Sequence, residues 1–191
     1  MAENKLNGVR VAILVSNCFE QSELTEPRKA LEEAGATTHI VSVQSGAIRG
    51  MKNDEKADTF KVDFTLDQVT PDEFDAVLLP GGVFNSDFLR VDERAQEFVR
   101  AIDNVGKPIA VICHAPWMLI SAGLVEGRTL TSYYTIEDDV RNAGGHWVDQ
   151  EAVRDDNWVS SREPADLPAF NREMIIMFDE LKGPREQPRA A

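Results

Sequence analysis

A cysteine and a histidine stand together at the end of a short apolar run, where a predicted strand meets a predicted helix. Cys113 directly follows the run at residues 109–112, and Pro116 begins the helix. This is the pattern of a nucleophile elbow, which lifts a side chain above the carboxyl edge of a sheet. The N–H groups and partial positive charge of the helix favour a thiolate by lowering the cysteine pKa. We therefore predict that Cys113 is a reactive thiolate; the alternative is a buried structural cysteine.

His114 is the first candidate partner of this thiol. A histidine can act as the general base for a cysteine nucleophile, so the pair indicates nucleophilic catalysis. Adjacent residues rarely face one another, and a packing or turn-stabilising role for His114 is the alternative. The sequence does not decide between them, because the tautomer and the geometry of the imidazole are properties of the fold.

Glu20 is the candidate acid, because it lies in the loop at residues 16–23 after the first predicted strand. In a parallel sheet this loop lies at the same edge as Cys113. If the two groups touch, we expect Glu20 to keep a raised pKa and to share a proton with the thiol. The alternative is a solvated or helix-capping acid. Glu23 and Glu26 fit that alternative better, because they belong to the helix itself.

Two glycines end another predicted strand at the same edge, at Gly81 and Gly82. Glycine lets the backbone approach a ligand closely and point its N–H groups inward. The N–H groups of Gly82 and His114 are therefore candidates for an oxyanion hole that holds a tetrahedral intermediate. A simple turn is the alternative.

The second cysteine, Cys18, lies in the same loop as Glu20. It is a candidate resolving thiol for an oxidised Cys113, although a partly buried bystander fits the position better. His39 and His146 fall at predicted strands and fit structural roles. No spacing in the chain resembles a zinc or phosphate-binding motif, and we expect no metal and no cofactor.

Alternating strands and helices must position these residues. The opening strand, helix and strand predict a parallel sheet with a right-handed crossover. We predict one three-layer α/β domain over residues 1–191, with a core at 9–181 and a disordered tail at 183–191. Strands are predicted at 9–15, 37–43, 75–79, 109–112, 129–132, 146–148, 152–154 and 158–160, a hairpin within 46–64, and helices at 22–34, 70–73, 92–104, 116–121, 135–143 and 166–181.

Charge and composition limit the partners of the chain. Its 191 residues carry 20 basic and 33 acidic side chains, a formal net charge of −13. Nucleic acids and anionic membranes need a positive surface, so we expect neither as a partner. No apolar run approaches the roughly 20 residues that cross a bilayer, and no signal-peptide pattern begins the chain, so we expect a cytoplasmic protein.

Several motifs together resemble the ThiJ/PfpI superfamily, and within it the PfpI-like branch of intracellular cysteine peptidases and general stress proteins. The resemblance runs from about residue 9 to residue 181. The matching motifs are Phe19-Glu20 with Glu23-Leu24 and Pro27, Leu79-Pro80-Gly81-Gly82, Ile112-Cys113-His114 with Pro116, Leu119-Ile120-Ser121-Ala122-Gly123, Thr131-Ser132-Tyr133, and Asn157-Trp158-Val159-Ser160-Ser161-Arg162 with Pro164-Ala165-Asp166-Leu167.

This resemblance implies a flavodoxin-like fold related to class I glutamine amidotransferases. It implies Cys113 as the nucleophile, with Glu20 hydrogen-bonded to it and His114 beside it. It also implies a homo-oligomer, a dimer or a higher assembly, because proteolytic relatives complete a Cys–His–Glu triad with an acid from a neighbouring subunit. That acid falls on Asp87, which is one methylene shorter than glutamate. Ala115 replaces the usual glycine after the Cys–His pair, and both departures weigh against peptidase activity.

Two functions therefore compete. The first is a stress-response hydrolase that uses Cys113 as its nucleophile and acts on peptides or on aldehyde-derived adducts. The second is a non-enzymatic sensor of oxidative stress, in which Cys113 is oxidised to a sulfinic acid.

Overall fold

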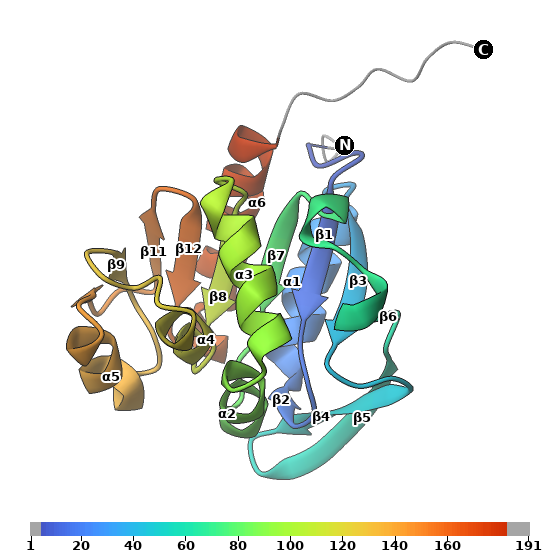
Figure 1. Cartoon of the computed structure of the whole chain (residues 1–191), viewed down its shortest axis with the longest axis horizontal. Coiled ribbons are helices and arrows are strands. Elements are labelled where there is room, and N and C mark those ends of the chain that lie inside the picture. Colours follow the sequence, from blue (N-terminus) through green and yellow to red (C-terminus); the bar gives the residue numbers. More distant parts are fainter. Residues whose placement is uncertain (1–4, 183–191) are drawn as a thin grey trace.

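The protein is described by a computed structural model that covers residues 5–182, so the predicted disordered tail at 183–191 lies outside the described residues. Its centre is a seven-stranded sheet with the order β11-β12-β8-β7-β1-β3-β6 (Figure 1). In chain order these strands are β1 (Arg10–Leu14), β3 (Thr37–Ser42), β6 (Phe64–Thr65), β7 (Ala76–Leu79), β8 (Ile109–Ile112), β11 (Ala152–Asp155) and β12 (Trp158–Ser161).

Every neighbouring pair in this sheet is parallel except β11 with β12. The central strands β7 and β8 are continuous apolar runs, and β1 is apolar after Arg10, as expected for strands that are covered on both faces. The predicted α/β fold with a mostly parallel sheet is therefore confirmed.

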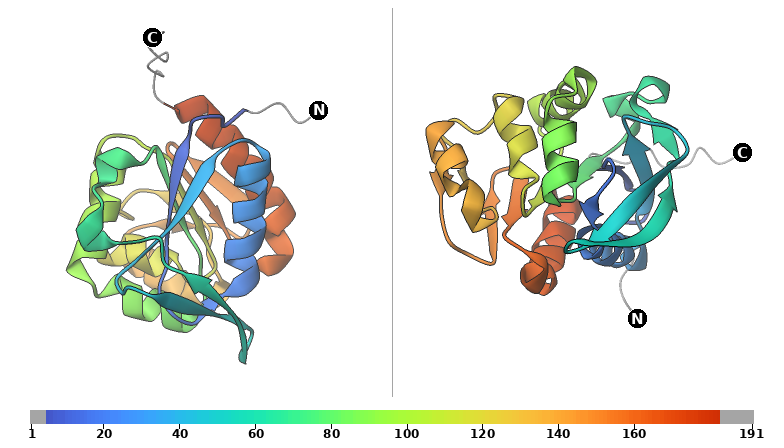
Figure 2. Two further views of the ribbon diagram at one scale, coloured as in Figure 1. Left: turned by 90° about the vertical axis from the view of Figure 1, so that its right-hand side faces the viewer. Right: turned by 90° about the horizontal axis from the view of Figure 1, so that it is seen from below.

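Helices cover both faces of the sheet (Figure 2). Helices α1 (Gln21–Glu33) and α6 (Leu167–Leu181) pack on one face, where Leu24 and Phe170 belong to the same hydrophobic core as Ile13 of β1. Helices α3 (Glu93–Asn104) and α4 (Pro116–Ser121) pack on the other, where Phe98 and Leu119 meet Leu14. Successive side chains of a strand point to opposite faces, so β1 contributes to both cores.

A small three-stranded sheet lies beside the carboxyl ends of the central strands (Figure 1). It consists of β2 (Phe19–Glu20), β4 (Ala47–Lys52) and β5 (Glu55–Lys61), and β4 and β5 form the predicted hairpin. The hairpin turns at Asn53, whose φ of 57° is tolerated by asparagine. The β4–β5 hairpin therefore lies beside the carboxyl edge of the central sheet, where Cys113 is located.

The remaining elements are short. Helix α5 (Glu137–Asn142) lies near a separate pair of strands, β9 (Thr129–Leu130) and β10 (His146–Trp147). In the part of the chain that the structure describes, single turns of 3-10 helix are η1 (Leu66–Gln68), η2 (Pro71–Glu73), η3 (Tyr134–Ile136) and η4 (Pro164–Asp166). No helix within residues 5–182 is both long enough and apolar enough to span a bilayer.

One helix was not predicted from the sequence: α2 (Val83–Arg90), which follows the two glycines at the end of β7. Its sequence contains asparagine, serine and aspartate, which favour turns over helix interiors. Asn85 compensates through tertiary contacts. Its side chain donates to the carbonyls of Pro80 and Gly81, at 2.9 and 3.0 Å, and accepts from the N–H of Ser16 at 2.6 Å.

Candidate active site

Cys113 lies at a strained turn directly after β8. Its φ is 64°, a left-handed conformation that is uncommon for residues other than glycine. The turn is fixed on both sides, because Cys113 donates its N–H to the carbonyl of Ser161 and its carbonyl accepts from the N–H of Tyr133. The thiol lines a cavity of about 270 Å³, and the residue is only 7% exposed. The cavity is lined by Glu20, Glu23, Asn53, Gly82, Val83, Cys113, His114, Tyr133 and Pro164.

The acid beside the sulfur is Glu23, in the first turn of α1. Its side chain is fully buried, and Oε2 accepts the N–H of Gly81 at 2.9 Å. Burial raises its pKa to about 8, whereas a hydrogen-bonding interaction with Cys113 lowers it and the charge of Glu20 raises it. The other oxygen, Oε1, is buried with no hydrogen-bond partner of good geometry among the described residues. Glu23 is therefore protonated at neutral pH.

The structure thus corrects the prediction that Glu20 is the acid next to the thiol. Glu20 precedes the first residue of α1 and has an extended backbone, so its side chain leaves toward the hairpin. Its carboxylate accepts the hydroxyl of Ser22 at 3.1 Å and the N–H of Asn53 at 3.0 Å. Glu20 lines the mouth of the cavity and holds the hairpin turn there, whereas Glu23 reaches the sulfur.

Burial of the thiol acts against the low pKa that the sequence predicts for Cys113. Burial raises the pKa of Cys113, and the nearby Glu23 carboxylate, once ionised, raises it further. Two backbone N–H groups, those of Gly82 and His114, act in the opposite direction because they point at the sulfur. The helix argument leaves out desolvation, which is the largest effect on the pKa of this buried group.

The two glycines permit this close approach. A Cβ on Gly81 would lie 2.5 Å from Oε2 of Glu23 and 2.6 Å from Cβ of Cys113. Gly82 has a φ of 86°, and a Cβ there would lie 2.6 Å from the backbone nitrogen of Glu20. Any larger residue at either position would push the acid, the thiol or the first loop away.

His114 faces Cys113 despite being its neighbour in the chain. Its Nδ1 lies 3.2 Å from Sγ of Cys113, and its Nε2 lies 3.2 Å from Oγ1 of Thr135. Burial lowers the pKa of His114 to about 4, so the ring is neutral at neutral pH. The ring also packs between Trp117 and Tyr133, with centroid distances of 5.3 and 4.9 Å. Nδ1 of His114 is therefore placed to accept a proton from the Cys113 thiol, as a general base does.

The other predicted residues lie further from this centre. Asp87 is exposed on α2, and the contact of His114 Nε2 within the chain is with Thr135 instead. Cys18 is a free, partly exposed thiol with a φ of 60°, in the loop between β1 and β2. His39 packs its ring against Phe64 and Phe74, in keeping with a structural role.

Sequence reasoning missed Asn85, Thr135 and Tyr133. Asn85 is fully buried on the unpredicted α2, where it ties the glycine turn to the first loop. Thr135 and Tyr133 come from the chain after β9, far in sequence from the thiol. Of these three residues, only Tyr133 belongs to a motif of the family resemblance, Thr131-Ser132-Tyr133, and that motif assigned it no function.

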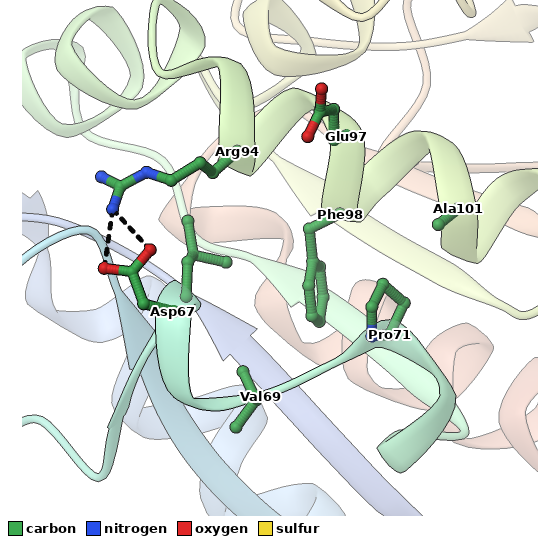
Figure 3. A pocket seen from close by; sticks show the side chains of 8 residues that line it. Asp67, Val69, Pro71, Arg94, Glu97, Phe98 and Ala101 are labelled. Atoms are coloured by element: carbon green, nitrogen blue, oxygen red, sulfur yellow. Dashed lines mark hydrogen bonds and ion pairs between the residues drawn. The ribbon is translucent and has the colours of Figure 1, made fainter.

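Other cavities are less suited to chemistry. A cavity of about 330 Å³ on the α3 side has an apolar floor that includes Phe98 and Pro71, and Arg94 at its rim is bound to Asp67 (Figure 3). Within residues 5–182, no group of three or more histidine, cysteine, aspartate or glutamate side chains could hold a metal ion. The thiol cavity remains the candidate active site.

Comparison with known proteins identifies relatives of nearly the same length. "Deglycase PfpI" of Pyrococcus furiosus is 46% identical over 170 residues, which cover 89% of this chain and 99% of the relative. "Protein/nucleic acid deglycase 2" of Escherichia coli is 45% identical over 171 residues, covering 88% and 97%. "General stress protein 18" of Bacillus subtilis is 40% identical over 173 residues, covering 90% and 99%.

A solved structure supports the same assignment. A two-domain protein from Anabaena variabilis, with DJ-1/ThiJ/PfpI-like and ferritin-like domains, aligns with a TM-score of 0.83 and 31% identity. The alignment covers 96% of this chain and 52% of that one, so this chain spans about half of the two-domain protein. The model of the DJ-1/PfpI family matches residues 9–177, and this protein therefore belongs to the DJ-1/PfpI family.

Proposed function

We propose that the protein is a cysteine-dependent hydrolase of the deglycase type, which removes α-oxoaldehyde adducts from amines. The observation that carries this proposal is the group of three side chains in the cavity. The Cys113 thiol lies between the buried, protonated Glu23 and the neutral imidazole of His114. A nucleophile, an acid and a base are thus within reach of one small substrate group. The names of two close relatives point to the same reaction class.

The reactive form is the Cys113 thiolate with a proton on Glu23. When the pair loses one proton, the remaining charge is shared between sulfur and carboxylate, and the two groups titrate as a unit. The backbone N–H groups of Gly82 and His114 favour the charge on sulfur. The same two N–H groups are placed to hold a negative oxygen on a substrate bonded to that sulfur.

The reaction needs no external oxidant. In an early adduct, the carbon on nitrogen bears a hydroxyl and the next carbon is a carbonyl. The sulfur bonds to the first carbon as its bond to nitrogen breaks, and the nitrogen takes a proton from Glu23. His114 then moves a proton from this carbon to its neighbour through an enediol, which gives a thioester. Water cleaves the thioester into a hydroxy acid and the free thiol, so one carbon is oxidised as the other is reduced.

Peptide hydrolysis has less support within a single chain. A Cys–His–acid triad needs a carboxylate on His114, and Thr135 occupies that position here. The acid expected from the resemblance, Asp87, is exposed on α2 between Phe84 and Phe88, which are 61% and 60% exposed. We propose that this apolar face of α2 joins copies of the chain into a homo-oligomer, which would bring Asp87 to a subunit boundary.

A second candidate function is sensing of peroxide. The protonated carboxyl of Glu23 next to the thiol favours it, because that acid can donate a hydrogen bond to a sulfinate oxygen. Two peroxide molecules would each transfer one oxygen to the sulfur and leave as water.

The cytoplasmic location and the resolving role of Cys18 stay predictions. The prediction of no nucleic-acid partner is weakened, because one relative is named for nucleic acid as well as protein.

Turnover of a methylglyoxal adduct of a blocked amino acid tests the first proposal. Release of hydroxy acid is expected from the wild type and to fall at least about a thousandfold in Cys113→Ser, because the nucleophile is lost. Cys18→Ser is the matched control and should keep the wild-type rate. If Cys113→Ser turns over adducts as fast as the wild type, the hydrolase proposal is wrong. If no adduct is turned over but peroxide adds two oxygens to Cys113 alone, the sensor is the function.

A further inference from the structure

One buried asparagine side chain holds the glycine turn that faces the thiol. Asn85 lies in the first turn of α2 and is fully buried. Its Nδ2 donates to the carbonyls of Pro80 and Gly81, at 2.9 and 3.0 Å, and its Oδ1 accepts the N–H of Ser16 at 2.6 Å. A carbonyl can only accept and an N–H can only donate, so these partners allow one orientation of the amide.

The two peptide units held in this way also carry the N–H groups that face the Cys113–Glu23 pair. The carbonyl of Pro80 shares a peptide unit with the N–H of Gly81, which donates to Oε2 of Glu23 at 2.9 Å. The carbonyl of Gly81 shares the next unit with the N–H of Gly82, which points at the sulfur. Within residues 5–182 no peptide bond is cis. In a trans unit the carbonyl and the N–H point in opposite directions, so each held carbonyl aims an N–H at the pair.

Glycine on both sides of a peptide unit leaves its orientation open. Rotation of the unit between Gly81 and Gly82 changes only ψ of the first and φ of the second, and neither residue has a Cβ to oppose it. The rotated unit would present the Gly81 carbonyl oxygen to the sulfur, where it would repel a thiolate or an oxyanion. Rotation would also leave the buried Asn85 amide without one of its acceptors, which is costly. The side chain of Asn85 therefore opposes the rotation.

These contacts differ from those of a helix cap. Helix α2 begins after Gly82, and no side chain caps its first N–H groups. A capping side chain would accept those N–H groups, whereas Asn85 donates to carbonyls that precede the helix. The next residue, Ser86, is buried on the same helix, and its hydroxyl has no hydrogen-bond partner of good geometry among the described residues. Ser86 is therefore a matched control, equally buried but without a side-chain bond to the glycine turn.

We propose that Asn85 is a positioning residue that aims two backbone N–H groups, those of Gly81 and Gly82, at the reacting pair. Asn85 is not among the residues that line the thiol cavity, so it acts through the turn. Its bond to Ser16 fixes the turn against the first loop at the same time. The effect on turnover rests on the proposed hydrolase function, whereas the orientation of the N–H groups does not.

Amide resonances in NMR spectra report where these N–H groups point. In the wild-type background, Cys113→Ser should shift the Gly82 amide proton, because its partner changes from sulfur to oxygen. In Asn85→Leu and Asn85→Asp backgrounds, the same substitution should leave the Gly82 amide nearly unmoved, whereas the His114 amide should respond in every background. Leucine removes all hydrogen bonds of the asparagine, and aspartate keeps the acceptor for Ser16 but lacks the amide donors.

A purely structural role for Asn85 gives a different result. It would lower the urea midpoint of the Asn85 variants and leave the response of the Gly82 amide intact. A full Gly82 response in either folded variant would therefore overturn the inference. Ser86→Ala should keep the full response; if it loses the response as the Asn85 variants do, any change in α2 disturbs the turn and the assignment to Asn85 is wrong.

Turnover of the methylglyoxal adduct of a blocked amino acid measures the catalytic consequence. In Asn85→Asp, kcat should fall about a hundredfold and KM should change less than about threefold, because a misdirected N–H no longer holds the oxyanion of the transition state. Ser86→Ala should keep the wild-type kcat. A normal kcat in a variant that has lost the Gly82 response would overturn the catalytic part of the inference. A wild type that turns over no adduct would instead remove the hydrolase proposal, and the amide response would still decide the role of Asn85.

Discussion

Cys113 and Glu23 act as one unit, because each changes the protonation of the other inside a water-poor cavity. Burial alone would keep both groups neutral. The N–H groups of Gly82 and His114 counter this for sulfur, and the N–H of Gly81 does so for the carboxyl. In the proposed mechanism, the reactive thiolate forms when the pair loses one proton, and its stability depends on the proton that stays behind.

Alkylation of the thiol should follow this shared titration. In a Cys18→Ser background, the rate of iodoacetamide reaction is expected to rise with pH around a midpoint above that of a free thiol, because burial and the neighbouring Glu23 raise the pKa of Cys113. Glu23→Gln should move the midpoint downward and speed the reaction several-fold at pH 7.5, because the charge and the hydrogen bond of Glu23, which both raise the pKa of the thiol, are lost while the burial penalty remains. A midpoint near 5 in the wild type would contradict this account.

The same group makes stability depend on pH. The pKa of Glu23 is about 8 in the folded state, whereas the ordinary pKa of a glutamate is 4.5, so the folded state binds more protons between these limits. Its contribution is fully present below about pH 4.5 and is lost as pH rises through 8. We expect the free energy of unfolding to fall across this window, and to fall less in Glu23→Gln. An unchanged slope in the variant would mean that Glu23 is ionised in the fold.

At the scale of elements, the end of β7 and the start of α2 bring the first loop against the thiol. Gly82 packs against the backbone of residues 18–20, and Asn85 bonds both the glycine turn and Ser16. Glu20 and Gln21 hold the hairpin from the other side. The side chain of Gln21 donates to Asp58 at 2.7 Å and accepts its N–H at 2.8 Å. The cavity is thus formed where three separate segments meet.

Gly82→Ala should damage this junction more than conformational strain alone can explain. Gly106 offers the control, because its φ of 71° also favours glycine while a Cβ there meets nothing within 4 Å. Gly106→Ala is expected to cost about 1 kcal/mol of unfolding free energy, and Gly82→Ala about 3 kcal/mol or more, with loss of turnover. Urea denaturation measures both. Equal costs would show that the first loop can move aside without loss.

For the whole molecule, the exposed apolar face of α2 contrasts with a chain of net charge −13. Phe84, Phe88 and the neighbouring Val91 are 60–72% exposed, whereas most large apolar side chains of the sheet and the other helices are buried. Charge repulsion between copies opposes association, so a contact there needs a large apolar contribution. A subunit boundary at α2 would also bring Asp87 of one copy near another copy.

The oligomeric state should depend on this face. Phe84→Ser with Phe88→Ser is expected to shift the protein toward the monomer in size-exclusion chromatography with light scattering, because the apolar contact is removed. Val105→Ser is the control, since Val105 is 64% exposed on a different surface. A wild-type monomer at micromolar concentration, or an oligomer unaffected by the double substitution, would contradict the proposed assembly.

Local signals in the sequence determined the architecture and the position of the thiol. The apolar runs fix the central strands, because a strand covered on both faces must be apolar throughout. The Cys113–His114 pair and the two glycines could be identified because each directly follows one of these predicted strands. A strand that stops at glycine or turns into a helix marks the carboxyl edge, where parallel sheets place their sites.

Only the tertiary structure decided which acid serves the sulfur and how that sulfur ionises. Glu20 and Glu23 are three residues apart, and the exact start of α1 sends one side chain to the hairpin and the other to Cys113. Helix α2 depends on the side chain of Asn85, which accepts a hydrogen bond from the distant N–H of Ser16, and no local propensity records that bond. Desolvation likewise arises from atoms contributed by the whole fold, so the raised pKa of Cys113 could not be derived from its neighbours along the chain.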